Sequence, residues 1–241
     1  MDLQLRGCVG IEHLSPQFTS GNNLRRLSII TSTKIEWKWF QSTTKLEFLG
    51  LTLTVANSSI KEVSKLIKLL SKIPTFSCLE LDSPTLEVFG PPPSDLARPA
   101  TKAVNLRSLT VYRLKIHNFC QILYVVYMIR SFPNLQDICI ELALDQVKSL
   151  NPKEATIELY LASLDWKDMF LDRLQTVKMK GVVHSRYVLH FIKLLLASSP
   201  SLKVISLFCS TKITCPKEKL RIKQDLQQCH RLSLDAQIIW C

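Results

Sequence analysis

A short apolar pattern recurs seven times along the chain. It has the form L-x-x-L-x-L, with other apolar residues in place of some leucines. The distances between successive copies are 22, 30, 30, 29, 39 and 28 residues. Copies at a near-constant step indicate a stack of similar units, because one such unit cannot bury its apolar face without its neighbours. The copies begin at Leu24, Leu46, Phe76, Leu106, Leu135, Leu174 and Leu202, and a shortened eighth copy with Leu3 and Leu5 opens the chain.

Each unit reads as a strand followed by a helix. The L-x-L half of the pattern has the period of two that puts apolar side chains on one face of a strand. Residues 60–73, 119–132 and 185–198 have helical periodicity instead, and in 60–73 the apolar and lysine side chains fall on opposite faces. We therefore predict an α/β fold, a leucine-rich-repeat solenoid with a curved parallel sheet and helices on its outer face.

The main competing α/β fold is a doubly wound nucleotide-binding fold. That fold needs a glycine-rich turn to hold phosphate, and the six glycines form neither a G-x-G-x-x-G nor a Walker sequence. The solenoid is therefore favoured. Residues 90–99 read as a proline-rich loop and 151–170 as an inserted helix; a helix over 217–229 and a last strand over 232–240 follow the final copy.

Several segments in the second half resemble a known family. IRSFPNLQDICIEL, a helical insertion ending near LDWKDMF, LQTVKMKGVV and FIKLLLASSPSLKVISL occur in that order, and RLSLDAQIIW closes the chain. This order is similar to that of the plant F-box/FBD/LRR-repeat proteins, and IPTFSCLELDSPTLEVFG followed by NLRSLTV resembles their middle repeats. The resemblance implies leucine-rich repeats over residues 1–132, truncated at the N-terminus, and an FBD-like segment continuing the solenoid over 133–241.

The resemblance also implies a function. Proteins of this family recruit targets to SCF-type ubiquitin ligases, with an N-terminal F-box on the ligase adaptor and the repeats on the target. We expect a target protein as partner, and the adaptor as partner only if an F-box precedes this chain, because Met1 falls within a repeat and the chain contains no F-box. A truncated regulatory fragment without coupling to a ligase is the first alternative.

We predict no catalytic, cofactor or metal site. No G-x-S-x-G nucleophile turn occurs, and the five histidines are scattered. Cys209 and Cys215 with Cys229 and His230 are the best metal candidates, but five residues separate the first pair, more than the two to four of zinc sites. We therefore expect a protein that is not an enzyme.

Composition and charge bear on the compartment and the partner. The 241 residues are 46% hydrophobic, which excludes a disordered chain. The N-terminus has no signal-peptide pattern, and the longest apolar stretches are too short to span a bilayer, so we expect the cytoplasm and/or the nucleus and no membrane partner. The net charge of +11 leaves a basic nucleic-acid-binding repeat protein as a second alternative.

The side chains between the strand leucines should line the concave face of the sheet. They are mixed and partly acidic in the middle of the chain and basic toward its ends, whereas a groove that follows phosphates should be basic throughout. We therefore expect this face to bind protein, with aromatic side chains as apolar contacts and charged ones as specificity determinants. The aromatic candidates are Phe48, Tyr112 and Phe208, and the charged ones are Glu80, Asp137, Glu141, Lys178 and Lys180.

Overall fold

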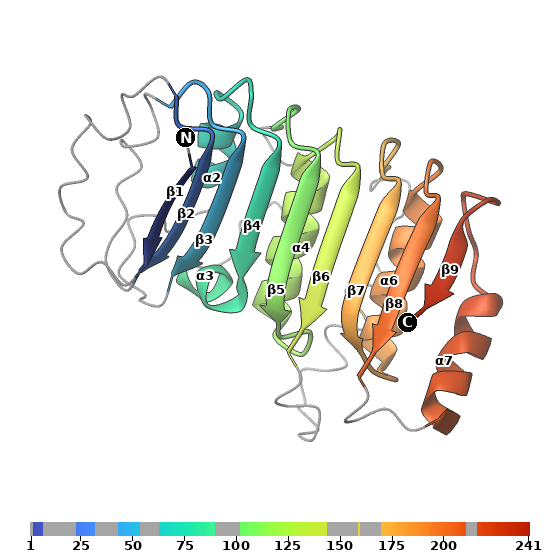
Figure 1. Ribbon diagram of the computed structural model, residues 1–241. Coiled ribbons are helices and arrows are strands. Elements are labelled where there is room, and N and C mark those ends of the chain that lie inside the picture. Colours follow the sequence, from blue (N-terminus) through green and yellow to red (C-terminus); the bar gives the residue numbers. More distant parts are fainter. Residues whose placement is uncertain are drawn as a thin grey trace. The chain divides into compact units, whose positions relative to one another are not determined.

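The computed structural model is an α/β structure built on a parallel sheet (Figure 1). It describes residues 2–6, 23–31, 43–53, 63–89, 102–143, 159, 170–210 and 216–241. Within these ranges nine strands follow one another in the sheet in chain order, and five helices lie between strands from β3 onward. The prediction of an α/β chain with a parallel sheet is confirmed. The chain separates into two compact units.

The first unit comprises residues 1–111 and 123–133. Its strands are β1 (Asp2–Arg6), β2 (Arg26–Thr31), β3 (Phe48–Leu53), β4 (Cys78–Asp82) and the first part of β5 (Ser108–Leu114). The pairs from β1 to β4 are parallel, with Arg26 opposite Phe48 and Gly50 opposite Glu80. Its helices are α2 (Val63–Leu70), α3 (Ser83–Val88) and most of α4 (Phe119–Ser131).

The second unit comprises residues 112–122 and 134–241. Its further strands are β6 (Asp137–Leu142), β7 (Thr176–Val182), β8 (Val204–Cys209) and β9 (Gln237–Trp240), all paired in parallel. Its helices are α6 (Arg186–Ser198) and α7 (Pro216–Gln227). Figure 1 shows α6 on the far side of β7 and β8, which leaves the near face of these strands without a described helix.

The repeat pattern accounts for the core. In all seven copies the strand begins two residues after the first apolar position, as at Leu46 and Phe48. All three apolar positions of every copy are at most 3% exposed. Burial of one such side chain stabilises the fold by about 1.5–3 kcal/mol, so the pattern sets both the strand positions and the packing. In the copy at Leu174, for example, the buried residues are Leu174, Val177 and Met179.

Some elements differ from the predictions. The last strand begins at Gln237 rather than at residue 232, because the Ser233 hydroxyl donates a hydrogen bond to the Leu202 carbonyl (2.7 Å) and holds the preceding segment in a turn. Leu234 is consequently 93% exposed. The short helix α3 was not predicted. The loop over 90–99 lies outside the described residues, as does the inserted helix over 151–170 apart from Leu159 and Phe170.

The predicted helices are close to the observed ones. Helix α4 ends before Pro133 and α6 before Pro200, as expected of helices that precede a proline. In the predicted helix over 60–73, residues 60–62 lie outside the described part and α2 covers 63–70. None of the helices in the described ranges is long and apolar enough to cross a bilayer.

Candidate functional site

The side chains that alternate with the buried core of the second unit form one continuous surface. The strand register places them in rows across the sheet, because in parallel strands residues two apart share a face. We call this surface the β6–β9 face. It consists of Asp137, Cys139 and Glu141 on β6, Thr176, Lys178 and Lys180 on β7, Val204, Ser206 and Phe208 on β8, and Gln237 and Ile239 on β9.

Opposite charges occupy neighbouring strands of the β6–β9 face. Glu141 is opposite Lys180 in the register, and the Lys180 Nζ atom lies 3.7 Å from the Glu141 Oε2 atom. Both side chains remain about 40% exposed, so this ion pair contributes little stability. Two rows away, beyond the row of Cys139 and Lys178, the Thr176 hydroxyl donates a hydrogen bond to the Asp137 carboxylate. These contacts orient both carboxylates while leaving them accessible to a partner.

The other side of the β6–β9 face is more apolar. Phe208 and Val204 are half-buried on β8, and Ile239 on β9 is 43% exposed. The Lys178 Nζ atom lies 4.9 Å from the centre of the Phe208 ring, a cation–π contact worth about 0.5–1 kcal/mol at an exposed site. The face therefore changes across its strands from carboxylates through lysines to apolar side chains.

Two of the predicted contact residues lie in the first unit. Phe48 is only 8% exposed, because the Arg26 guanidinium lies 4.1 Å from the centre of its ring. A partner could reach the Phe48 ring only if Arg26 moved, so Arg26 is the accessible group at this position. Glu80 is half-buried on β4, opposite Gly50 of β3.

The structure thus brings together five of the eight predicted residues, namely those on β6, β7 and β8. Tyr112 belongs to the second unit and is half-buried on β5. Ile239 was not among the predicted residues, although the alternation over 237–240 beside the last repeat was a signal for it. Whether any of the eight residues binds a target remains a prediction.

The cysteine at the end of β8 does not have the setting of a nucleophile. Burial raises the pKa of the Cys209 thiol above its ordinary value of 9.0, and the nearby Lys219 and Lys223 charges only partly offset this effect. A raised pKa disfavours the thiolate, which is the reactive form. Cys215, which the sequence analysis considered and rejected as a metal ligand, lies outside the described residues, and the described residues contain no cluster of three or more potential metal ligands.

Two histidines of the second unit, His184 and His190, have structural contacts. The His184 Nε2 atom lies 3.4 Å from the Asp225 Oδ2 atom of α7. The His190 Nδ1 atom lies 2.9 Å from the Arg186 carbonyl oxygen, one turn earlier in α6. These contacts join α7 to the segment before α6 and fix a ring on α6, and they do not form a nucleophile–base pair.

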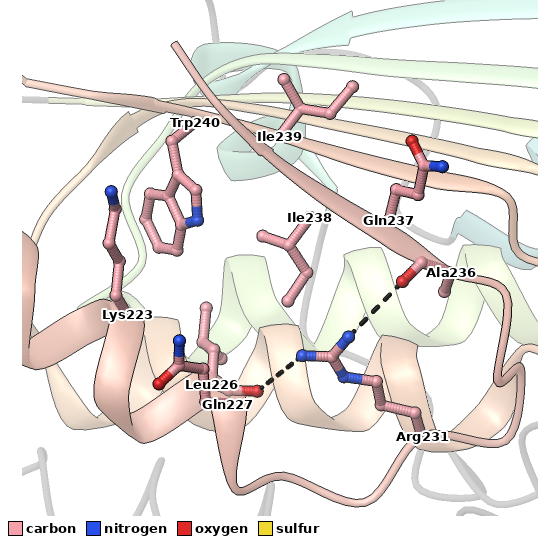
Figure 2. Close-up of a pocket in the computed structure, with 9 residues that line it drawn as sticks. All are labelled: Lys223, Leu226, Gln227, Arg231, Ala236, Gln237, Ile238, Ile239 and Trp240. Carbon is pink, nitrogen blue, oxygen red and sulfur yellow. Dashed lines mark hydrogen bonds between the residues drawn. The ribbon is translucent and has the colours of Figure 1, made fainter.

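A groove lies between α7 and β9 at the end of the second unit (Figure 2). It is open to solvent and has a volume of about 600 Å³. Arg231 closes one end, where its guanidinium donates hydrogen bonds to the carbonyl oxygens of Leu226 (3.1 Å) and Ala236 (3.4 Å). The groove was not predicted, because it depends on how the turn before β9 folds.

Comparisons with known proteins leave the family open. No family model matches the chain, and no curated protein matches it. Among solved structures, the chain is similar to a protein from Bacteroides fragilis solved by a structural genomics consortium, with 12% sequence identity and a TM-score of 0.35. The match covers 90% of this chain and 67% of that chain. At this similarity it carries no argument about fold or function.

Proposed function

We propose that this chain is a non-enzymatic protein-binding module and that the β6–β9 face holds the target. The observation that carries this proposal is the arrangement of Asp137, Glu141, Lys178 and Lys180 beside the half-buried Phe208 on a hydrogen-bonded sheet. Apolar side chains supply affinity at protein interfaces, and complementary charges select the partner. Side chains on a sheet are already positioned, which reduces the entropy lost on binding.

The charge pattern favours protein over nucleic acid as the partner of this face. Asp137 and Glu141 would repel phosphates, and Lys180 is already paired with Glu141. Nucleic-acid affinity comes mostly from cations that neutralise phosphates and falls steeply as salt rises. Retention on heparin that is weak and independent of salt is the expected result. Strong retention that salt abolishes would favour the basic nucleic-acid-binding alternative.

We further propose that the module resembles the target-recognition part of an SCF-type ubiquitin ligase subunit. Support comes from the order of segments shared with plant F-box/FBD/LRR-repeat proteins, among them IRSFPNLQDICIEL and RLSLDAQIIW. Under this proposal the protein acts in the cytoplasm and/or the nucleus, and it contacts the ligase adaptor only if an F-box precedes the chain. Without one, the chain acts as a regulatory fragment that competes for the same target.

Site-specific photocrosslinking tests the binding proposal. A photoreactive amino acid replaces Lys178, which is exposed on the β6–β9 face, or Lys68, which is exposed on α2 and serves as the matched control. Each protein is irradiated in an extract of its source cells, and crosslinked proteins are identified by mass spectrometry. We expect a protein that is captured from position 178, is absent at 68 and is lost when Phe208→Ala is added. Equal capture at the two positions, or capture that Phe208→Ala leaves unchanged, contradicts the proposal.

A further inference from the structure

We propose that the free edge of β9 and the groove between α7 and β9 form a second docking site, which takes an extended acidic segment of a partner protein as an added strand. The site is separate from the β6–β9 face and does not depend on the function proposed for that face. Four observations support it: the backbone groups of β9, the lining of the groove, its charge, and the net charge of the chain.

The backbone of β9 has one paired and one unpaired side. The N–H groups of Gln237 and Cys241 donate to the carbonyl oxygens of Lys203 and Leu207, beside β8. In a parallel strand the groups of alternate residues point in opposite directions, so the N–H and C=O groups of Ile238 and Trp240 point away from β8. Since β9 is the last strand in the order of the described sheet, these groups form a free edge that an extended peptide can pair with.

The groove provides side-chain contacts for such a peptide. Figure 2 shows Ile238 and Trp240 pointing from β9 toward α7, where Leu226 and Gln227 form the opposite wall. Residues of an added strand alternate between its two faces, so every second side chain of the peptide would enter the groove. Ile238 and Trp240 are both half-buried, which leaves part of their apolar surface for a partner.

The charge of the groove specifies the peptide. Lys223 and Arg231 line the groove, and its nine lining residues include no carboxylate. The Lys223 Nζ atom lies 5.4 Å from the centre of the Trp240 ring, and Arg231 donates two of its five N–H groups to backbone carbonyls. In the described part of the chain, neither cation lies within ion-pair distance of a carboxylate. A peptide with carboxylates on its groove-facing side would supply the missing partners.

The same charges disfavour a second copy of this chain as the occupant. Pairing of two β9 edges about a twofold axis would bring Lys223 and Arg231 of one copy toward those of the other. The chain also carries a net charge of +11, so two copies repel each other at low salt. An acidic extended segment satisfies both the backbone edge and the cations, and a second copy satisfies only the edge.

A designed decapeptide serves as the probe. Threonine fills its odd positions, and valine and glutamate alternate at its even positions, so that one face carries both apolar and acidic side chains. A second peptide has lysine in place of glutamate, and a third has an N-methyl group on every residue, which removes the strand-forming donors of both edges. Binding is measured by fluorescence anisotropy at low salt. We expect saturable binding of the acidic peptide only.

Variants locate the probe on the protein. Ile238→Pro removes an N–H that faces the free edge and leaves the hydrogen bonds to β8 in place, so we expect binding to weaken at least about tenfold, with Ile238→Val near wild type. Lys223→Glu should weaken binding of the acidic peptide by about tenfold. Its matched control, Arg221→Glu, changes an exposed cation of the same helix outside the groove and should leave binding unchanged.

Several results would overturn the proposal. They are the absence of saturable binding, equal binding of the acidic and basic peptides, or wild-type affinity in Ile238→Pro. A wild-type dimer in sedimentation that dissociates in this variant would assign the edge to a second copy instead. Circular dichroism checks the fold of each variant. If Ile238→Pro does not fold, the N-methylated peptide decides, because its binding at the affinity of the unmethylated peptide would rule out strand addition.

Discussion

A buried hydroxyl joins helix α3 to the sheet, and its removal should destabilise the first unit measurably. Thr85 is fully buried, and its Oγ1 atom accepts a hydrogen bond from the Leu53 N–H (2.9 Å). The same hydroxyl donates to the Asp82 carboxylate (2.6 Å) or to the Leu51 carbonyl (3.0 Å). Asp82 is itself buried and caps α3 through the Thr85 N–H (3.0 Å). Thr85→Val keeps the branched shape and deletes only these hydroxyl contacts.

The expected cost can be summed from the groups that lose a partner. The Leu53 N–H becomes a buried unpaired donor, which costs about 1–3 kcal/mol. The Asp82 carboxylate loses the Thr85 hydroxyl as a donor, which adds about 1 kcal/mol because its cap to the Thr85 N–H remains. We therefore expect the free energy of unfolding of the first unit to fall by about 2–4 kcal/mol.

Urea unfolding and hydrogen exchange measure this loss. The unfolding midpoint should decrease with little change in slope, and the Leu53 amide should exchange faster. Thr75→Val is the matched control, because Thr75 is an exposed residue whose hydroxyl donates to the Leu46 carbonyl (2.9 Å) or to the Thr44 carbonyl (3.1 Å), and its loss should cost about 1 kcal/mol or less. A loss in Thr85→Val no larger than in Thr75→Val would show that the Thr85 hydroxyl does not hold α3 on the sheet.

Three further perturbations follow from single contacts. Gly181 has a φ of 73° at an irregularity in the pairing of β7 with β8, a left-handed conformation that is unfavourable for residues with a Cβ atom. Gly181→Ala should therefore lower the free energy of unfolding by roughly 1–2 kcal/mol in urea titrations. An unchanged value would contradict this prediction. Arg231→Ala removes the guanidinium hydrogen bonds to the Leu226 and Ala236 carbonyls, so it should lower the free energy of unfolding by about 2 kcal/mol and speed amide exchange at Gln237. Unchanged exchange at Gln237 would show that these hydrogen bonds do not hold β9 in place. Burial raises the pKa of Cys209, so its alkylation at pH 8 should be slower than that of the exposed Cys241. The alkylation of Cys209 should be slower still in the double variant Lys219→Met/Lys223→Met, which removes the charges that lower this pKa. Equal rates at the two cysteines would contradict this prediction.

The strands could be predicted because their signal is short and repeated. At Leu46 and Leu174 alike, an apolar residue two positions before the strand and alternating apolar residues within it are buried. A period of two sets both the strand and the face that its side chains line, so the sequence sufficed for the seven central strands. It also sufficed to name residues such as Lys178 and Phe208, which the structure places in contact.

Other elements depend on contacts between distant residues. Helix α3 is too short for a periodic pattern, although Asp82 as its cap and Pro84 in its first turn were local signals for its start. The alternation L-S-L at residue 232 imitates a strand, but the bond from Ser233 to Leu202 prevents it. Arg26 covers the Phe48 ring because the two residues are opposite each other where β2 pairs with β3. This register depends on both strands, so it cannot be predicted from the sequence of either strand alone.

The proposed function depends on protein binding by the β6–β9 face. Its most direct test is the affinity of the captured partner for the double variant Lys178→Ala/Phe208→Ala, measured by calorimetry beside the control Lys68→Ala. Side chains at the centre of a protein interface each contribute on the order of 1–2 kcal/mol or more, so we expect the double variant to weaken binding at least about tenfold and the control to leave it unchanged. Affinities of the double variant and the wild type that agree within about twofold would contradict it.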